Sequence, residues 1–414
     1  MDSSLNLTST TVKLAHQASR QLAVAGGLAR RQGVMAMAQG LQANFDDILE
    51  ANTLDLEMSR EMAVPELILD WLKLTPERLE ITVNTLKQLA RIADPTRRVI
   101  NASYQLEPAQ TYCQLMPLGT IALIYEAFPE LGAIAAGMCI KTGNSLILRG
   151  CSAASHCNIV IGKILQNALE SAQLPPECLG IISSDQGGSI QELVTQDQYL
   201  NLIVPYGRPS LIQQVTEQAT APVLKTAMGN CYLYWSASGD LELVRHLITD
   251  SHSSEPDPVN AIEKVIIHSQ KKLSSVLSLF SSLQEQGFQL RGDANLITEF
   301  PEYLKPARDT EWGQAYLTKT VTFRYANNLT EAIALINRYS SGHADCLVTE
   351  SYEESRQFIQ EVDSSLVYVN ASPRFSRNPN QGENIFFGMS NQKGYRQGLI
   401  GLETFTTLKQ IVQG

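Results

Sequence analysis

The chain has 414 residues, of which 44% are hydrophobic and 18% are charged, and its formal net charge is −10 at pH 7. A chain of this length exceeds one ordinary core, so we expect two or three domains. The acidic balance and the lack of a dense basic run argue against a nucleic-acid partner. No apolar stretch approaches the ~18 to 20 residues of a membrane span, and the first residues lack a signal-peptide pattern.

The chain contains seven cysteines and six histidines. The number of cysteines is odd, several lie inside apolar runs, and none forms a CxxC pair. This usage indicates reduced thiols in a cytoplasmic protein and no disulfide framework. The histidines show no metal-ligand spacing, so we expect no metal site.

Residues 8–92 have the pattern of a helical region, because apolar residues recur at three- and four-residue spacing. Gly26-Gly27 predicts a turn between two helices, and Thr75-Pro76 predicts an N-cap followed by proline in the first turn. The pattern stops at Asp94-Pro95. Residues 98–116 change to alternation and predict a hairpin with its turn near Glu107-Pro108.

A βαβ unit follows. Thr120–Tyr125 and Ser145–Leu148 are short apolar runs that predict buried strands, and Leu131–Ile140 between them predicts a closely packed helix. Such a unit implies parallel strands and a right-handed crossover. Ligands of open parallel sheets bind beyond the carboxyl ends of the strands, which here are residues 125–130 and 149–155.

Alternating strands and helices continue from residue 118 to 235, which predicts a doubly wound domain. Within this region Pro222–Ala227 is predicted to be a strand. A second alternating α/β region follows the proline-containing loop 253–259 and ends with a strand at Ser365–Val369. Residues 376–394 are polar and predict a long loop, and the tail 401–414 predicts a terminal strand.

Eight sequence landmarks follow one another along the chain: PLGTIALIYE, CIKTGNSLILRG, LNLIVP, GNCYLYW, VNAIEKVIIH, SGHADCLVTE, VYVNASPRF and GLETFTTLK. The N-terminal stretch NTLDLE fits the same series. In order and spacing these landmarks resemble those of γ-glutamyl phosphate reductase, a family of the aldehyde dehydrogenase superfamily. The resemblance covers nearly the whole chain.

The resemblance implies an α/β fold of the aldehyde dehydrogenase type. It assigns residues 1–97 and 120–235 to a Rossmann-type cofactor-binding domain and residues 236–372 to an α/β catalytic domain. Residues 98–119 and 395–414 would form a small oligomerisation β element. It further implies a cytoplasmic homo-oligomer that binds NADP and a small-molecule substrate, with no membrane or nucleic acid.

The family reaction reduces L-glutamyl 5-phosphate to L-glutamate 5-semialdehyde with NADPH, in proline biosynthesis. In that chemistry a cysteine thiolate displaces phosphate to form a thioester, and hydride from the nicotinamide reduces it. A loop asparagine amide and backbone N–H groups stabilise the oxyanion.

The family nucleophile stands just before the asparagine–alanine pair that opens the catalytic domain. In the stretch EPDPVNAIE this position is Val259, whose side chain has no nucleophilic atom, so a thioester cannot form there. A one-residue slip of the alignment offers Pro258 or Asn260, and neither is a nucleophile. The resemblance therefore implies the family scaffold without an intact catalytic residue.

Other positions of the family site differ as well. Glu130 replaces the oxyanion asparagine, and its negative charge would repel a developing oxyanion and an acyl phosphate. Further replacements are Phe128 for the arginine of the same loop, Glu255 for the arginine ahead of the nucleophile, Lys225 for a strand glutamate, Tyr206-Gly207-Arg208 for arginine-glycine-glycine, and Phe386 for the glutamate on the nicotinamide-side ribose.

Three residues are candidates for binding a cofactor. Arg149 and Ser152 follow the strand at Ser145–Leu148, where a cofactor phosphate could bind, although Arg149 could equally be a strand-end arginine paired with a carboxylate. Gly207 is part of no complete glycine-rich phosphate motif.

Three residues in the stretch VNASPRF are candidates for binding the substrate: Asn370, Ser372 and Arg374. Arg374 could hold a substrate carboxylate with two hydrogen bonds. The alternative is that all three only shape the loop, and the sequence leaves both readings open.

Three further residues are weaker candidates. Cys231 could be a replacement nucleophile, but a buried thiol at a strand end is the favoured interpretation. His268 ends an apolar strand, so we expect it to serve packing. His252 is interpreted as a solvated loop residue and not as a proton carrier.

Three hypotheses of function follow. The first is an NADPH-dependent γ-glutamyl phosphate reductase, as the resemblance along the whole chain implies. The second is a catalytically inactive paralogue, a pseudoenzyme that binds a related metabolite or pairs with an active reductase or with glutamate 5-kinase. The third, ranked last, is a different reaction in the same cleft that uses Glu130 or Lys225.

Overall fold

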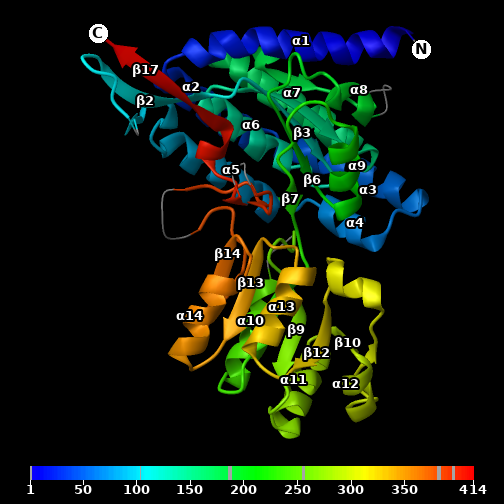
Figure 1. Ribbon diagram of the computed structural model, residues 1–414. Helices are drawn as coiled ribbons and strands as arrows, with labels where there is room; N and C mark the ends of the chain where they lie inside the picture. The colour runs from blue at the N-terminus through cyan, green and yellow to red at the C-terminus, as the bar shows by residue number, and fades with distance from the viewer. Residues whose placement is uncertain (1, 103, 185–188, 254–256, 380–383, 394–396) are drawn as a thin grey trace. The chain divides into compact units, whose positions relative to one another are not determined.

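The protein is described here by a computed structural model that covers residues 2–102, 104–184, 189–253, 257–379, 384–393 and 397–414 (Figure 1). The chain forms two compact units. Unit 1 comprises Met1–Thr226, Arg377–Gly388 and Leu399–Gly414, and unit 2 comprises Ala227–Ser376 and Met389–Gly398. The roles that the resemblance assigns to particular ranges of the chain stay predictions.

Five helices open unit 1, as the periodicity predicts: α1 (Asp2–Val24), α2 (Gly27–Ala43), α3 (Phe45–Glu61), α4 (Glu66–Leu72) and α5 (Pro76–Arg91). The break between α1 and α2 falls at Gly26, which confirms the predicted turn. The hydroxyl of Thr75 accepts a hydrogen bond from the backbone N–H of Arg78 at 3.3 Å, and Pro76 takes the first helical position. The predicted N-cap is thus confirmed.

A parallel four-stranded sheet in the order β5-β4-β3-β6 is the centre of unit 1. Its strands are β3 (Thr120–Tyr125), β4 (Ser145–Gly150), β5 (Leu179–Ile181) and β6 (Leu202–Tyr206), and its helices are α6 (Leu131–Thr142), α7 (Ser155–Ser171), α8 (Ile190–Val194) and α9 (Pro209–Gln218). The βαβ unit of β3, α6 and β4 is confirmed. Every residue of α6 is buried, which its small apolar side chains allow.

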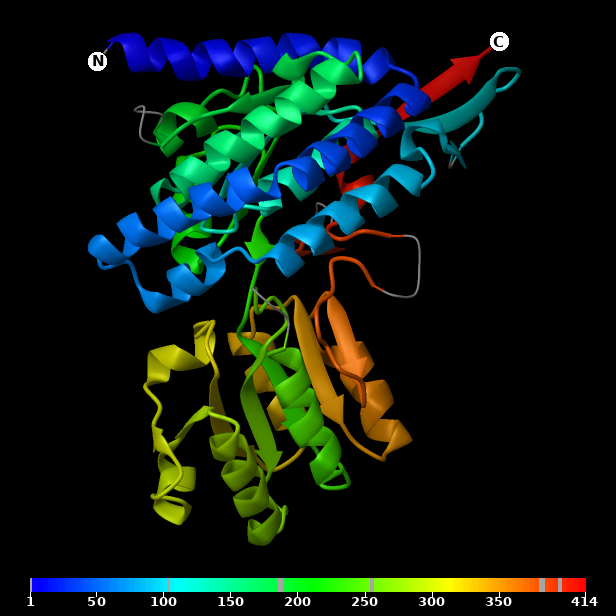
Figure 2. The ribbon, with the colours of Figure 1, turned by 180° about the vertical axis from the view of Figure 1, so that it is seen from behind.

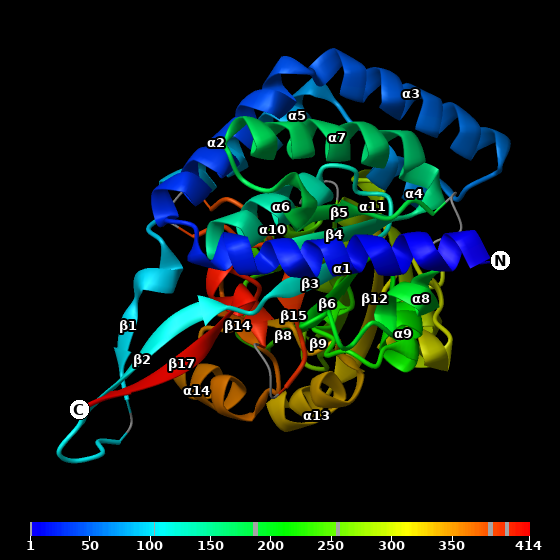
Figure 3. The same ribbon diagram turned by 90° about the horizontal axis from the view of Figure 1, so that it is seen from above.

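Helices cover both faces of this sheet. Val12 and Ala15 of α1 share a hydrophobic cluster with Ala122 of β3, and α8 and α9 add side chains to the same cluster. Figure 3 shows α1 lying across the sheet, while α6 and α7 lie beyond it, next to α2 and α5. The sheet is therefore doubly wound, as predicted. The predicted range 118–235 is wrong at its end, because the strand Cys231–Trp235 pairs in the sheet of unit 2.

A separate three-stranded antiparallel sheet, also in unit 1, has the order β1-β2-β17. Its strands are β1 (Val99–Asn101), β2 (Gln110–Pro117) and β17 (Thr406–Gln413). The hairpin and the terminal strand that the sequence predicts are both confirmed, and the structure shows that they pair with each other. In Figure 3 the β2–β17 ribbon extends away from the helices of unit 1. We call β1, β2 and β17 the assembly sheet, after the oligomerisation role that the resemblance implies and that stays a prediction.

A seven-stranded parallel sheet in the order β11-β10-β12-β9-β8-β13-β14 is the centre of unit 2. Its strands are β8 (Cys231–Trp235), β9 (Ile262–His268), β10 (Gln289–Gly292), β11 (Lys305–Pro306), β12 (Thr320–Ala326), β13 (Ala344–Val348) and β14 (Leu366–Val369). The parallel pairing confirms the predicted second α/β region.

Helices also cover both faces of this second sheet. They are α10 (Leu241–Ser251), α11 (Leu273–Glu285), α12 (Ala294–Glu299), α13 (Leu329–Tyr339) and α14 (Tyr352–Glu361). Figure 2 shows α10 and α11 in front of the sheet, and Figure 1 shows α13 and α14 on the opposite face. Two separate hydrophobic clusters fill these faces, and the one beneath α10 and α11 contains Phe280.

Two predictions, the strand at Pro222–Ala227 and the loop at residues 376–394, are wrong in part. Pro222–Ala227 is not a continuous strand, because only Thr226–Ala227 forms a strand (β7), and Val223 makes a single bridge to Ile203. Proline at 222 has no N–H for a ladder, which shortens the pairing. The predicted loop 376–394 contains a short strand, β15 (Met389–Ser390), and is followed by β16 (Gly398–Leu399); its residues 380–383 and 394 lie outside the described part.

Hydropathy along the helices bears on membrane insertion. Among the described residues, no helix is at once long enough and apolar enough to span a bilayer.

Phe280 provides a test of the core of unit 2. Its ring packs edge-on against Phe300 and Phe323, with centroids 5.3 and 4.8 Å away, and it is fully buried. We expect Phe280→Ala to lower the free energy of unfolding of this unit by about 3–5 kcal/mol, through lost burial and the cavity left behind. Chemical denaturation followed by circular dichroism measures this. Ile359→Ala, at a half-exposed position, is the control and should change stability by less than about 0.5 kcal/mol.

Candidate functional site

Val259, which the resemblance assigns to the nucleophile position, is fully buried in unit 2 just before β9. Its backbone carbonyl accepts two hydrogen bonds, from His343 Nε2 at 2.7 Å and from the N–H of Gly229 at 3.0 Å. The peptide is therefore held firmly, and its side chain offers only methyl groups. No acyl transfer can begin at this side chain.

Cys231 and His343 lie beside this peptide, with Cys231 Sγ 3.4 Å from His343 Nε2. Burial lowers the pKa of His343 to about 4, so the ring is neutral near pH 7. Since Nε2 donates to the Val259 carbonyl, Nδ1 carries no proton and accepts from the hydroxyl of Ser341 at 2.8 Å. Burial also raises the pKa of the Cys231 thiol well above its usual value. Cys231 is thus a buried neutral thiol and not a replacement nucleophile.

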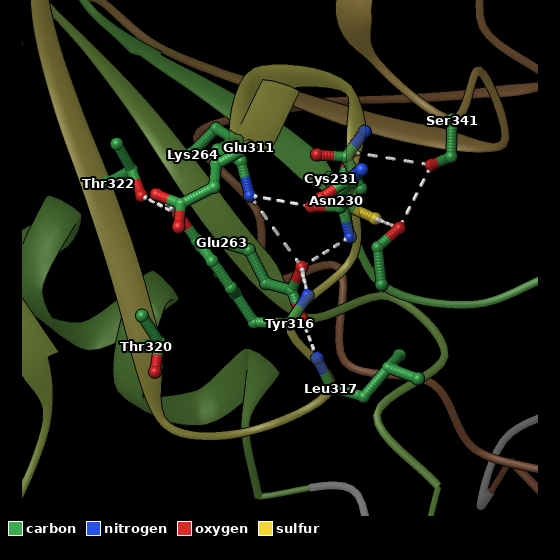
Figure 4. A network of polar contacts seen from close by, with 12 residues as sticks. Asn230, Cys231, Glu263, Lys264, Glu311, Tyr316, Leu317, Thr320, Thr322 and Ser341 are labelled. Atoms are coloured by element: carbon green, nitrogen blue, oxygen red, sulfur yellow. Dashed lines mark hydrogen bonds and ion pairs between the residues drawn. The ribbon is translucent and has the colours of Figure 1, made fainter. Parts of the chain in front are cut away.

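Glu263 anchors the segments around position 259 (Figure 4). Its carboxylate accepts hydrogen bonds from the backbone N–H groups of Asn230 and Tyr316 at 2.8 Å and of Leu317 at 2.7 Å. The pairing of β8 with β9 shifts register between Cys231 and Tyr232, so Glu263 lies in a β-bulge. Two separate segments, the turn before β8 and the loop before β12, are thereby tied to the start of β9.

Lys264 is buried next to this carboxylate. Its Nζ lies 3.9 Å from a Glu263 oxygen, donates to the carbonyl of Gln314 at 3.1 Å and sits 3.9 Å above the ring of Tyr316. Burial lowers the pKa of Lys264 to about 8, and the neighbouring carboxylate opposes that change. Both charged groups have partners within unit 2, which is the arrangement of a structural ion pair.

The three predicted substrate residues lie in one loop after β14. The amide of Asn370 exchanges two hydrogen bonds with the backbone of Thr349, at 2.7 and 3.0 Å. Ser372 donates to Asp250 at 2.5 Å, and Arg374 Nη1 lies 3.4 Å from the same carboxylate. These contacts hold the loop in shape. The exposed guanidinium of Arg374 still offers N–H groups to an anion.

Asn260 connects this loop to position 259. Its side-chain amide donates to the carbonyl of Pro373 at 2.8 Å, and the residue is almost fully buried. The structure therefore brings the nucleophile position and the predicted substrate loop together within unit 2.

Glu130, which the resemblance assigns to the oxyanion position, lies in unit 1 where the loop after β3 enters α6. Its carboxylate pairs with Arg78 Nη2 at 2.5 Å, and both side chains are largely buried. The charge that the sequence analysis expected to face a substrate oxyanion is therefore balanced by an arginine of α5. The carboxylate of Glu130 itself has no N–H group to donate to an oxyanion.

Arg149 and Ser152 lie at the carboxyl end of β4. Arg149 is half-buried and its Nη1 donates to the carbonyl of Gly150 at 3.1 Å, while Ser152 is exposed at the start of a short 3₁₀ turn. The pocket between the ends of β4 and β5 has a volume of about 10 Å³ and is lined by Tyr125, Asn158 and others. That is room for about one water molecule.

Gly207 follows β6 with a φ of 150°, in the region that favours glycine. A Cβ there would meet a Glu126 carboxylate oxygen at 2.7 Å. The same carboxylate accepts from the backbone N–H and from Nη2 of Arg208, each at 2.8 Å. Gly207 therefore makes room for Glu126.

Other candidates fall in different surroundings. Lys225 is exposed, Phe386 is half-buried, and Glu255 lies outside the described residues. His268 is buried and accepts from the N–H of Gln270 at 3.1 Å.

The interpretation of His252 as a solvated loop residue is wrong. It ends α10, its Nε2 donates to the carbonyl of Ile262 at 3.0 Å, and its ring packs against Phe288. Burial lowers the pKa of His252 to about 4, so the ring serves packing in its neutral form.

Comparisons with known proteins decide the family. No protein-family model matches the chain. The chain itself is 57% identical over 389 residues to γ-glutamyl phosphate reductase 2 of Synechocystis sp. This match covers 94% of this chain and 93% of that protein. The chain belongs to the γ-glutamyl phosphate reductase family. The crystal structure of the Thermotoga maritima reductase matches with a TM-score of 0.89 at 29% identity, covering 99% of this chain and 98% of that one.

Family membership and the aldehyde dehydrogenase-like fold confirm the resemblance that the sequence landmarks indicate. A probable aldehyde dehydrogenase of Listeria monocytogenes matches with a TM-score of 0.72 at 14% identity, covering 99% of this chain and 97% of that one. At that identity the match shows the fold alone.

The family implies a nicotinamide cofactor, and the residues at the carboxyl edge of the unit 1 sheet do not fit one. The pocket beyond β4 and β5 has a volume of about 10 Å³, which is room for about one water molecule. At the end of β6, the carboxylate of Glu126 accepts the hydrogen bonds that Arg208 could otherwise donate to a phosphate. Among the described residues, no group of three or more histidine, cysteine, aspartate or glutamate side chains could hold a metal ion.

Sequence reasoning missed four residues that define these surroundings: Arg78, Glu126, Asp250 and His343. His343 lies within the landmark SGHADCLVTE, so a family signal for it was available. Arg78 and Asp250 are separated in sequence from their partners and show no local motif.

The burial of His343 makes the free energy of unfolding depend on pH. An unfolded histidine titrates near 6.5, while burial holds the pKa of His343 at about 4. The stabilisation is therefore complete above pH 6.5 and is lost as pH falls through 4, because only the unfolded chain gains the proton in that interval. The difference corresponds to roughly 3 kcal/mol. We expect His343→Gln to flatten the fall in the free energy of unfolding between pH 7 and pH 4, measured by urea denaturation. An unchanged slope would show that His343 is accessible to protons in the folded state.

Proposed function

We propose that this chain is a non-catalytic member of the γ-glutamyl phosphate reductase family. The observation that carries the proposal is Val259: its side chain is fully buried, has no nucleophilic atom, and its carbonyl is held by His343. The thioester route of the family needs a thiolate at this position.

No other thiol of the chain replaces the nucleophile. All seven cysteines are free, and six of them are buried. Cys151 is half-buried, and burial raises the pKa of its thiol. A neutral, inaccessible thiol is a poor nucleophile. Free thiols also agree with a cytoplasmic location, which we propose for this chain.

We propose that the chain acts as a partner subunit, assembled through the assembly sheet. This sheet keeps complete strand pairing while the nucleophile is lost. Its apolar side chains Leu408 and Val412 on β17 and Val99 on β1 are each more than half exposed. Leu408 and Val412 lie four residues apart on one face of β17, and exposed apolar side chains on one face favour burial against another subunit. The partner we favour is an active reductase of the same family, with glutamate 5-kinase or a second copy of this chain as the other outcomes.

A second candidate function is γ-glutamyl phosphate reduction itself, dependent on NADPH. The observation in its favour is the 57% identity, along nearly the whole length, to a protein named as a reductase.

A turnover assay separates the two candidates. Glutamate 5-kinase, glutamate and ATP supply glutamyl phosphate, and NADPH oxidation is followed by absorbance. We expect no oxidation above the kinase background with the wild type, because position 259 cannot form a thioester. Intact-mass measurement should show an acyl adduct only on Val259→Cys, with Val259→Ala as the matched variant that lacks a thiol. NADPH oxidation by the wild type that depends on glutamyl phosphate would contradict the proposal.

The assembly sheet has its own test. We expect the double variant Leu408→Asp and Val412→Asp to lose mixed oligomers with a co-expressed active reductase, because two buried carboxylates would oppose association. Native mass spectrometry measures the species present. Ile359→Asp, at an equally exposed apolar position on α14, is the control and should leave the mixed oligomers intact. Mixed oligomers that survive the β17 changes would place the contact elsewhere.

A further inference from the structure

The sheet of unit 1 has one topological switch point. The chain runs from β3 to β4 and β5 on one side and then returns to β6 on the other side of β3. Figure 1 shows β3 and β6 next to each other. In open parallel sheets a ligand enters the crevice beyond the carboxyl ends of the two strands at such a point. The residues that follow β3 and end β6 therefore decide whether this crevice is open.

Four aromatic rings fill the position beyond these strand ends. Phe128, after β3, stacks on Trp71 with centroids 4.7 Å apart and meets Tyr206, at the end of β6, edge-on at 5.7 Å. Tyr206 in turn meets Phe387 at 5.2 Å. Each of the four residues is at most 1% exposed. Trp71, Phe128, Tyr206 and Phe387 form what we call the aromatic cluster.

Arg377 closes the aromatic cluster on one side. Its Nη2 donates to the hydroxyl of Tyr206 at 3.0 Å, and its guanidinium lies 5.5 Å from the centroid of the same ring. Its Nη1 donates to the carbonyl of Phe387. The cation is thus used to join two members of the cluster.

Glu126 closes the other part of the crevice. Its carboxylate accepts from the backbone N–H of Arg208 at 2.8 Å and from Nε and Nη2 of the same residue at 3.2 and 2.8 Å. Arg208 is the N-cap of α9, a position where helices bind the phosphate of a ligand. An anion of the chain itself already uses these donors.

We propose that the switch-point crevice of unit 1 is closed from within, by the aromatic cluster and by the Glu126–Arg208 pair, so that the chain does not take up NADP(H) there. A dinucleotide could enter only if buried rings separated and if Arg208 exchanged its carboxylate for a phosphate. This inference concerns binding and does not depend on the residue at position 259.

Calorimetric titration with NADPH tests the proposal on the full chain. We expect no saturable heat from the wild type, which corresponds to a Kd weaker than about 1 mM. Emission from Trp71 should stay unchanged, since its contact with Phe128 persists. Saturable binding in the micromolar range, with a change in emission that is absent in Trp71→Phe, would overturn the proposal.

Variants that open the crevice complete the test. We expect Phe128→Ala combined with Tyr206→Ala to bind NADPH at least about tenfold more tightly than the wild type. Phe280→Ala, an equal truncation in the core of unit 2, is the matched control and should gain nothing. Glu126→Gln removes the competing charge without disturbing the rings, and should gain affinity for inorganic pyrophosphate. Folded variants, verified by near-ultraviolet circular dichroism, that bind no better than the wild type would overturn the role of closure.

The binding measurement and the turnover measurement test different proposals, so their outcomes can be told apart. NADPH binding without turnover would overturn the closed crevice and leave the non-catalytic proposal standing. Turnover by the wild type would overturn both.

Discussion

The carboxylate of Glu263 is the interaction on which the surroundings of position 259 depend. It is fully buried and accepts backbone N–H groups from Asn230, Tyr316 and Leu317, so it fixes the turn before β8 and the loop before β12 at the start of β9. A buried charge needs such complete pairing, because an unpaired one would be strongly destabilising. None of these bonds uses the side chain at 259.

The scaffold around position 259 is held by backbone contacts and not by the side chain at that position. The peptide of Val259 is held through its carbonyl by His343 and Gly229, and these contacts are indifferent to whether the side chain is valine or cysteine. Valine also fills a buried position well, since it has no polar atom to satisfy. The contacts that hold this peptide therefore do not depend on which of the two side chains stands at position 259.

The sequence predicted the helices and strands of this protein better than it predicted which distant side chains pair with one another. The βαβ unit from Thr120, the Thr75 cap and the hairpin were predictable because local periodicity and capping chemistry determine them. The partner of Glu130 was not, because Arg78 lies 52 residues earlier and meets it only after α5 packs beside α6. His252 was misjudged for the same reason: its polar sequence neighbours indicate a loop, while β9 supplies a carbonyl for its ring.

The changes in unit 1 are coupled through contacts, and this coupling makes them hard to reverse singly. The resemblance assigns family arginines to the positions of Phe128 and Tyr206, and here the two rings touch within a buried cluster. An arginine restored at 128 alone would place a cation between the rings of Trp71 and Tyr206, and the hydroxyl of Tyr206 already accepts from Arg377. A buried cation without an acceptor is strongly destabilising, so the single reversion is opposed by the fold itself. A return to arginine at these two positions would therefore require both changes and a new acceptor for Arg377 at once.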